Sequence, residues 1–171
     1  MLTYLIRWQI RGLERRLGEP LDYLRHMLTA SLGAFRAFVR AARVAAYRKH
    51  LPVAPCHVAR IVAVRHEDCG PCVQTAVNLA KADGVPADVL RAVLDRRVND
   101  LPEPLRDVYR FAEAVVEVSG EEEPYRARLR QVFGEAALCE LALAIATCRL
   151  FPTVKRALGY ATSCSLVQAE V

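Results

Sequence analysis

Residues 66–76 read His-Glu-Asp-Cys-Gly-Pro-Cys-Val-Gln-Thr-Ala. Two thiols, Cys69 and Cys72, stand three residues apart at the point where a helix is expected to begin. Asp68 is a good N-cap residue, and Pro71 is tolerated in a first helical turn. Gly84 is expected to end the helix, because glycine is favoured just beyond a helix C-terminus. The sequence therefore predicts a helix that starts at the cysteine pair and stops just before Gly84.

This position gives the two cysteines a specific chemistry. Residues i and i+3 of a helix share one face, so the two sulfurs are expected to lie within disulfide reach. The unpaired N–H groups and the positive end of the helix dipole favour a thiolate there, and the thiolate is the reactive form of cysteine. Cys69 and Cys72 are therefore the expected redox site. Zinc binding is a weaker alternative, since zinc needs four ligands and no second pair has suitable spacing.

Composition indicates one all-α domain over residues 1–171. Apolar residues make up 53% of the chain and aromatic residues only 7%. No stretch shows the sustained alternation of a half-buried strand. The expected helices cover residues 2–17, 21–32, 33–48, 56–66, 73–82, 86–99, 104–118, 125–133, 135–151 and 152–158.

Three local expectations accompany these helices. Residues 51–55 should form a linker, because each proline disfavours helical geometry in the residue before it. Residues 56–66 are rich in Val and Ile, but no partner strand is present, so a buried helix is expected. Residues 120–124 should form an exposed acidic loop.

Charge is divided unevenly along the chain. Residues 1–65 hold 12 Lys/Arg against 3 Asp/Glu, and residues 66–171 hold 12 against 16. The arginines are spaced through amphipathic helices, so a solvated face or a subunit contact is favoured over nucleic acid or a membrane. The helix at residues 2–17 is expected to pack on the body or on a neighbouring subunit rather than lie on a membrane.

No membrane-spanning helix is expected, because no uncharged apolar run reaches 18 residues. Arg7 interrupts any signal-peptide apolar region, so a soluble cytoplasmic protein is expected. Cys139 and Cys148 lie in an apolar run and should be buried small hydrophobes. Cys56 and Cys164 are expected to pack at loops or helix ends. No metal or other cofactor is expected.

Residues 55–95 resemble the carboxymuconolactone decarboxylase family, in its alkylhydroperoxidase D-like branch, which carries Cys-x-x-Cys. Residues 130–146 resemble the penultimate helix of that family. The aromatic-then-basic stretch from Phe151 to Gly159 is similar to the segment that follows it. The resemblance implies an antiparallel helical core at residues 51–171, preceded by N-terminal helices at 1–50, and a homo-oligomer such as a trimer or hexamer.

The same resemblance implies roles for individual residues. Cys72 would attack a small hydroperoxide, and Cys69 would resolve the sulfenic acid as a disulfide and exchange with an external dithiol. The branch usually carries a Glu where this chain has His57, and histidines where it has Pro71 and Ala76.

Candidate proton carriers remain, because imidazole titrates near neutral pH. His57 is one of them, and His66 with Glu67 offers a second possible base beside the cysteine pair.

The expected function is thus a thiol-dependent oxidoreductase that reduces hydroperoxides or a partner disulfide. Two alternatives stay open. One is a non-catalytic oligomeric scaffold or stress-response protein with a relict thiol pair. The other is a lactone decarboxylase of the same superfamily, although such members generally lack the cysteine pair.

Overall fold

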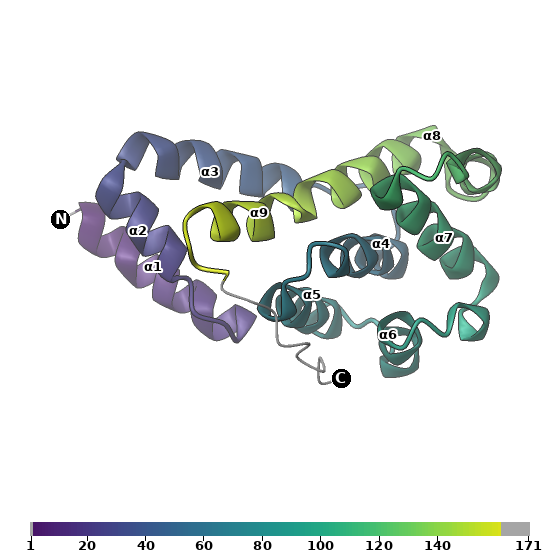
Figure 1. Ribbon diagram of the computed structural model, residues 1–171, viewed down its shortest axis with the longest axis horizontal. Coiled ribbons are helices and arrows are strands. Elements are labelled where there is room, and N and C mark those ends of the chain that lie inside the picture. Colours follow the sequence, from purple (N-terminus) through teal and green to yellow (C-terminus); the bar gives the residue numbers. More distant parts are fainter. Residues whose placement is uncertain (1, 162–171) are drawn as a thin grey trace.

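A buried helix, α4 (Val53–Arg65), lies at the centre of the fold (Figure 1). The structure is a computed structural model that describes residues 2–161. Nine of the 13 residues of α4 are buried, so the helix is apolar on nearly every side. Such a helix requires neighbours all around it, and α5, α6, α7 and α8 pack against it. The prediction of a buried helix in this Val- and Ile-rich segment is confirmed.

The described residues contain only helices and their connections. In chain order they are α1 (Leu2–Leu17), α2 (Asp22–Ala30), α3 (Leu32–Ala45), α4, α5 (Gly70–Ala82), α6 (Ala87–Leu94), the short 3-10 helix η1 (Val98–Asp100), α7 (Glu103–Glu117), α8 (Glu122–Cys148) and α9 (Leu150–Ala157). No strand occurs between residues 2 and 161. The all-α prediction is therefore confirmed.

The expected linker at residues 51–55 is shorter than predicted. Pro52 is the N-cap of α4, and Pro55 lies in its first turn. A proline is accepted there because the first N–H groups of a helix have no intrahelical partner. The two prolines therefore start the helix instead of extending the loop.

α8 contains the predicted break. Gly134 has φ 83° and ψ 166°, which is not a helical conformation, and it divides α8 into the two expected segments. The first segment begins at Glu122, so the acidic loop is shorter than predicted. By length and a mean hydropathy of 1.5 alone, residues 122–157 would be able to cross a membrane. In the fold, the apolar side of α8 packs on α4 and α7, which accounts for this composition.

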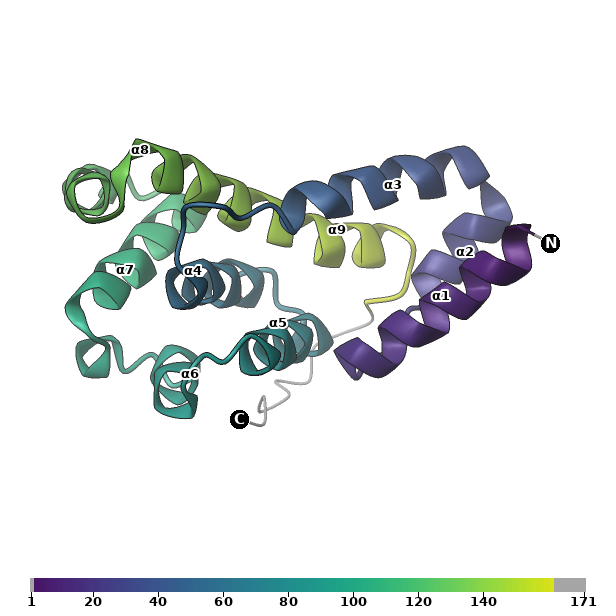
Figure 2. The ribbon, with the colours of Figure 1, turned by 180° about the vertical axis from the view of Figure 1, so that it is seen from behind.

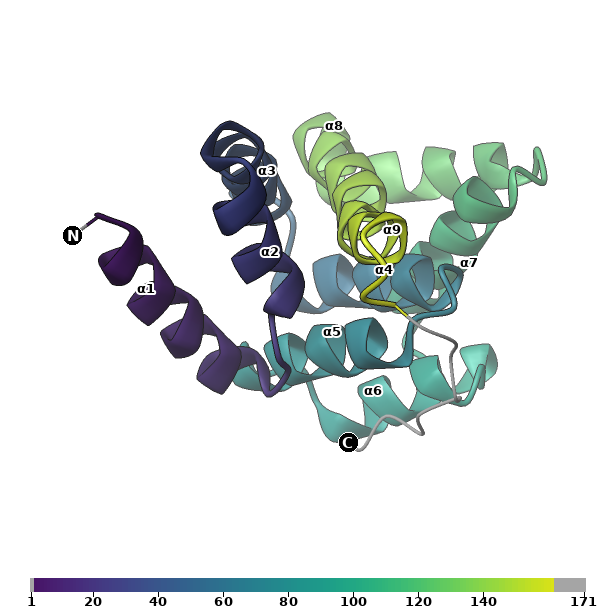
Figure 3. The same ribbon diagram turned by 60° about the vertical axis from the view of Figure 1, so that its left-hand side comes forward.

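Two hydrophobic clusters stabilise the molecule. The larger one joins residues of α4 to α8. The smaller one joins α1, α2 and α3 with α9, and in it Phe151 of α9 meets Phe38 of α3 edge to face, with 5.7 Å between ring centroids. Figure 3 shows α1, α2 and α3 together on one side of the molecule, with α6 and α7 on the other. The last described helix thus packs with the first three.

A buried carboxylate, Glu140 of α8, holds the loop that leads from α3 into α4. This loop runs beside α8 before it turns into α4 (Figure 2). Glu140 accepts hydrogen bonds from the backbone N–H groups of Lys49, His50 and Leu51 at 2.8–3.1 Å. Burial raises the pKa of Glu140, but these hydrogen bonds and one from His50 outweigh it and lower the pKa to about 2. The loop is therefore held by an ionised carboxylate.

Candidate functional site

The two predicted redox cysteines lie at the start of α5. Cys69 is the N-cap residue and Cys72 lies in the first turn, and they form a disulfide with 5.2 Å between their Cα atoms. The prediction that Asp68 is the N-cap is wrong. Asp68 instead has φ 50°, a left-handed conformation that Asp tolerates better than most residues, and it turns the chain from α4 toward α5.

The disulfide is largely covered by protein. Cys69 is 4% exposed and Cys72 is 6% exposed, and both belong to the larger hydrophobic cluster. The Cys72 N–H donates to the Cys69 carbonyl at 2.9 Å, which closes the first turn over the pair. The helix N-terminus favours a thiolate once the disulfide is reduced. The low exposure of the two cysteines leaves little room for a large reactant.

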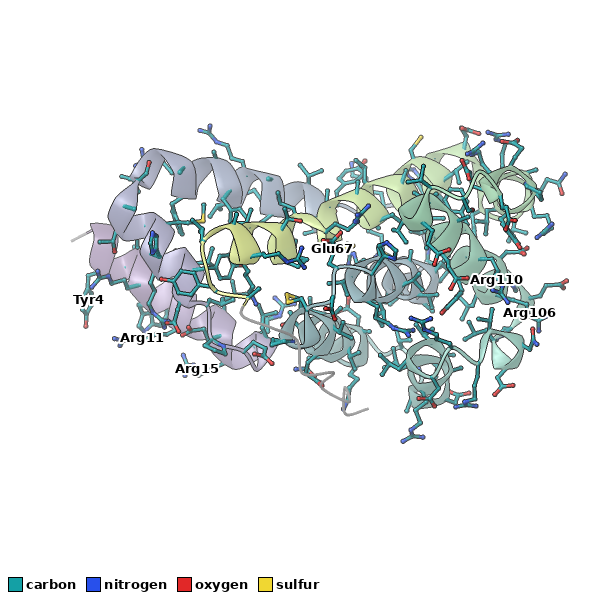
Figure 4. The ribbon with its side chains drawn as sticks, in the orientation of Figure 1. Tyr4, Arg11, Arg15, Glu67, Arg106 and Arg110 are labelled. Atoms are coloured by element: carbon teal, nitrogen blue, oxygen red, sulfur yellow. A yellow bond between two sulfur atoms is a disulfide. The ribbon has the colours of Figure 1, made fainter. Side chains whose placement is uncertain are left out.

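Glu67, two residues before Cys69, is paired with arginines from the other end of the chain. Its Oε1 accepts a hydrogen bond from Nε of Arg149 at 2.5 Å, and its Oε2 lies 3.6 Å from Nη1 of Arg156. Arg156 also donates to the Glu67 carbonyl. Only 10% of the Glu67 side chain is exposed, and Figure 4 shows it beside the α8–α9 junction. The Glu67 carboxylate, held between two cations, therefore anchors the turn before the cysteine pair.

His66 is the C-cap of α4 and is exposed to solvent. It precedes Cys69 by three residues, on the turn that carries the pair into α5. An exposed imidazole can exchange protons with water directly. Among the predicted proton carriers, His66 is the one that combines nearness in sequence to the cysteines with access to solvent.

His57 is bound at the far end of α5. Its Nε2 lies 2.8 Å from Oδ2 of Asp83, the C-cap of α5, and its side chain is 2% exposed. Asp83 follows Cys72 by eleven residues, which corresponds to about 16 Å along a helix axis. α4 and α5 are consecutive helices joined by a short turn, so a residue early in α4 meets the end of α5. The structure therefore brings His57 to Asp83 and not to the cysteine pair.

The environment of His57 favours neutral imidazole. Burial lowers the pKa of His57, and the hydrogen bond to Asp83 acts in the opposite direction. Its Nδ1 has no hydrogen-bond partner among the described residues. Asp83 was not predicted from the sequence. The signal for it was its position at the end of α5, just before Gly84, because the end of α5 lies beside the start of α4 when a short turn joins the two helices.

The remaining cysteines differ from the pair. Cys139 is exposed, so the prediction that it is buried is wrong: the buried residues beside it on α8 are Leu138 and Glu140. Burial raises the pKa of Cys148 to about 12 and also raises that of Cys56. These two thiols stay protonated at neutral pH. Cys164 lies outside the described residues.

No group of three His, Cys, Asp or Glu side chains within residues 2–161 is arranged to hold a metal ion. No family model matches the chain, and neither a curated protein nor a solved structure matches it. The redox assignment therefore depends on the cysteine pair and its surroundings.

Proposed function

We propose that this chain is a thiol-dependent oxidoreductase of the alkylhydroperoxidase D-like type, which reduces small hydroperoxides through Cys69 and Cys72. One observation carries the proposal: the two cysteines are joined as a disulfide across the first turn of a 13-residue helix. A pair in this position can interconvert between dithiol and disulfide without rearranging the helix.

The reaction begins from the reduced pair. The Cys72 thiolate attacks the outer peroxide oxygen, the O–O bond breaks, and the alkoxide takes a proton and leaves as an alcohol. Cys72 is then a sulfenic acid. The Cys69 thiol attacks its sulfur, water leaves, and the disulfide forms. An external dithiol reduces this disulfide by two thiol–disulfide exchanges and is itself oxidised.

The surroundings of the pair support a division of roles. His66 supplies the proton to the departing alkoxide, since it is exposed and lies on the same turn. Glu67 positions that turn through Arg149 and Arg156. The low exposure of both cysteines favours a small hydroperoxide over a protein disulfide as the oxidant.

The same low exposure favours a second candidate. A disulfide enclosed in a hydrophobic cluster is also what a non-catalytic helical scaffold would use to fasten a turn. In that case the thiols of the reduced protein would react no faster with peroxide than free cysteine does.

The test is a thiol count on the reduced protein before and after one equivalent of tert-butyl hydroperoxide. We expect two thiols per chain to be lost in the native protein. Cys72→Ser should consume no peroxide, because the attacking sulfur is missing. Cys69→Ser should consume one equivalent and accumulate a sulfenic acid that dimedone traps.

Cys139→Ser is the matched control, because it removes an exposed thiol outside the pair. It should behave as the native protein does. Peroxide consumption that survives Cys72→Ser would reject the proposed function. A native protein whose pair reacts only at the rate of free cysteine would establish the scaffold instead.

A further inference from the structure

α1 carries an aromatic outward face. Tyr4 is 78% exposed, Leu5 54% and Trp8 61%, whereas Ile10 on the opposite side is 4% exposed. At 100° per residue, Tyr4, Leu5 and Trp8 fall within one third of the helix circumference. A helix face that remains in solvent ordinarily carries polar side chains. Three large exposed side chains gathered on one face therefore indicate an interaction site.

The inward face of α1 is firmly attached to the body. Ile6, Ile10 and Leu17 pack in the smaller hydrophobic cluster. The Leu17 carbonyl accepts a hydrogen bond from Nδ2 of Asn78 on α5 at 3.0 Å. The outward face of α1 is thus exposed while the helix remains packed on the rest of the protein. A partner could bind this face without α1 detaching.

The outward face is also cationic. Arg7, Arg11, Arg15 and Arg16 are all exposed, and the first turn holds no acidic residue. None of the four belongs to an ion pair within 4.0 Å among the described residues. Figure 4 shows Tyr4, Arg11 and Arg15 projecting outward along the same side of α1.

The one acidic residue of α1 is engaged elsewhere. Glu14 accepts a hydrogen bond from the Leu21 N–H at 2.8 Å and pairs with Arg25 of α2. Glu14 also interacts electrostatically with Arg11, but the two do not form an ion pair within 4.0 Å. Because α1 holds four arginines and this single carboxylate, which is paired with Arg25, the outward face keeps a net positive charge around an apolar centre.

We propose that the outward face of α1 binds an anionic phospholipid surface, with the helix axis parallel to the membrane plane. Tyr4, Leu5 and Trp8 enter the boundary between headgroups and acyl chains, where aromatic rings are favoured. The arginines contact lipid phosphates. α1 lies at an outer edge of the molecule, so its residues can meet a flat surface together (Figure 3).

Binding of α1 to lipid does not require redox activity of the cysteine pair. It also revises the expectation that the first helix makes only protein contacts. Trp8 lies between Tyr4 and Leu5 on the helix surface. An apolar centre of this kind favours the boundary between headgroups and acyl chains over the phosphates of a nucleic acid. An isologous contact between two copies of α1 would bring like charges together, because each copy presents the same arginines.

Trp8 is the only tryptophan in the chain, so its fluorescence reports directly on this face. The full-length protein is titrated with vesicles of phosphatidylcholine mixed with phosphatidylglycerol, and with vesicles of phosphatidylcholine alone. We expect a blue shift and cosedimentation with the anionic vesicles only, weakened by added salt. Trp8→Ala should abolish cosedimentation or reduce it severely.

Charge is tested with two matched double variants. Arg11→Gln with Arg15→Gln should lower the vesicle partition coefficient about thirtyfold. Arg91→Gln with Arg110→Gln removes the same charge from exposed sites on α6 and α7 and should leave binding unchanged. Circular dichroism of each variant should match the native spectrum, because all four side chains are exposed.

Four results would overturn the proposal. The first is the absence of a Trp8 shift with anionic vesicles. The second is a Trp8 shift that appears without lipid as protein concentration rises, which would assign the face to a second copy. The third is a Trp8 shift with a DNA duplex in place of vesicles, which would assign the face to nucleic acid. The fourth is an equal loss of vesicle binding in the Arg91/Arg110 control, which would show attraction by net charge alone.

Discussion

Two buried polar side chains, Glu140 and His57, illustrate how partners decide the behaviour of a titratable group. Both are at most 3% exposed. Glu140 has three backbone N–H donors, and its pKa falls to about 2. His57 has a single partner, Asp83, and burial is the larger effect, so its pKa is lowered toward the neutral form. Burial opposes the charged form in both, and only Glu140 has enough hydrogen bonds to overcome it.

Glu140 should make the stability of the protein depend on pH in the acid range. Its pKa is about 2 in the folded protein and its usual value is 4.5, so the stabilisation is fully present above pH 4.5. It is lost progressively as the pH falls from 4.5 toward 2. Glu140→Gln should lower the urea midpoint at pH 7, because one amide oxygen replaces two carboxylate oxygens.

The difference between the native protein and Glu140→Gln should shrink steadily across that pH window. Urea unfolding followed by circular dichroism measures it. Glu135→Gln is the control, since its carboxylate is exposed and pairs only with Arg130. A pH-independent difference for Glu140→Gln would contradict the assignment.

At the scale of the helices, the C-terminal ends of α5 and α7 show how local sequence controls helix boundaries. α5 ends in a Schellman motif: Gly84 has φ 81°, its N–H donates to Lys81, and the Val85 N–H donates to Ala80. α7 ends with Val118 in the same left-handed region, at φ 55°. A β-branched residue is strained there, whereas glycine is not.

Val118→Gly should therefore stabilise the protein. Relief of the left-handed conformation contributes about 1–2 kcal/mol, and the greater freedom of glycine in the unfolded chain offsets about 0.5–1 kcal/mol of it. Val118 is 86% exposed, so little packing is lost. We expect a net gain of about 0.5–1 kcal/mol and a rise in Tm of about 2 °C.

Val132→Gly provides the opposite control. Val132 is 56% exposed and helical in α8, so glycine there should lower the free energy of unfolding by about 0.5 kcal/mol. Thermal unfolding of the two variants compares them directly. If both variants destabilise the protein, strain at Val118 is not relieved by glycine.

At the scale of the whole molecule, contacts between distant parts of the chain determine how the candidate site is held. α9 packs with α1, α2 and α3 in the smaller cluster. The α8–α9 junction also supplies Arg149 and Arg156, which hold Glu67 on the turn before Cys69. The turn that carries the cysteine pair is thus fastened both by the disulfide and by ion pairs to the C-terminal helices.

Reduction of the disulfide should loosen this arrangement without unfolding the protein. A link that closes a loop this short stabilises the folded state by about 2 kcal/mol. We therefore expect the reduced protein to unfold at lower urea concentration by about that free energy. Cys72→Ser should unfold identically with and without reductant. If the urea midpoint of the native protein is the same with and without reductant, the disulfide adds nothing to stability.

Much of the helical framework was predictable from local pattern. Apolar spacing placed the helices, Gly84 and Gly134 marked two of the breaks, and the apolar composition of residues 56–66 identified the central helix. Two of the errors were also local. Asp68 was one residue from the true N-cap, and Pro55 was assigned to a linker although a first turn accepts it.

The sequence alone established an all-helical chain with a cysteine pair at a helix start, because helix periodicity and i, i+3 spacing act within a few residues. Tertiary structure decided which partner each titratable group would meet. It joined His57 to Asp83, Glu67 to Arg149, and Glu140 to the loop before α4. It also exposed Cys139 and the outward face of α1. These outcomes depend on packing between segments as many as 91 residues apart, and no local pattern encodes such contacts.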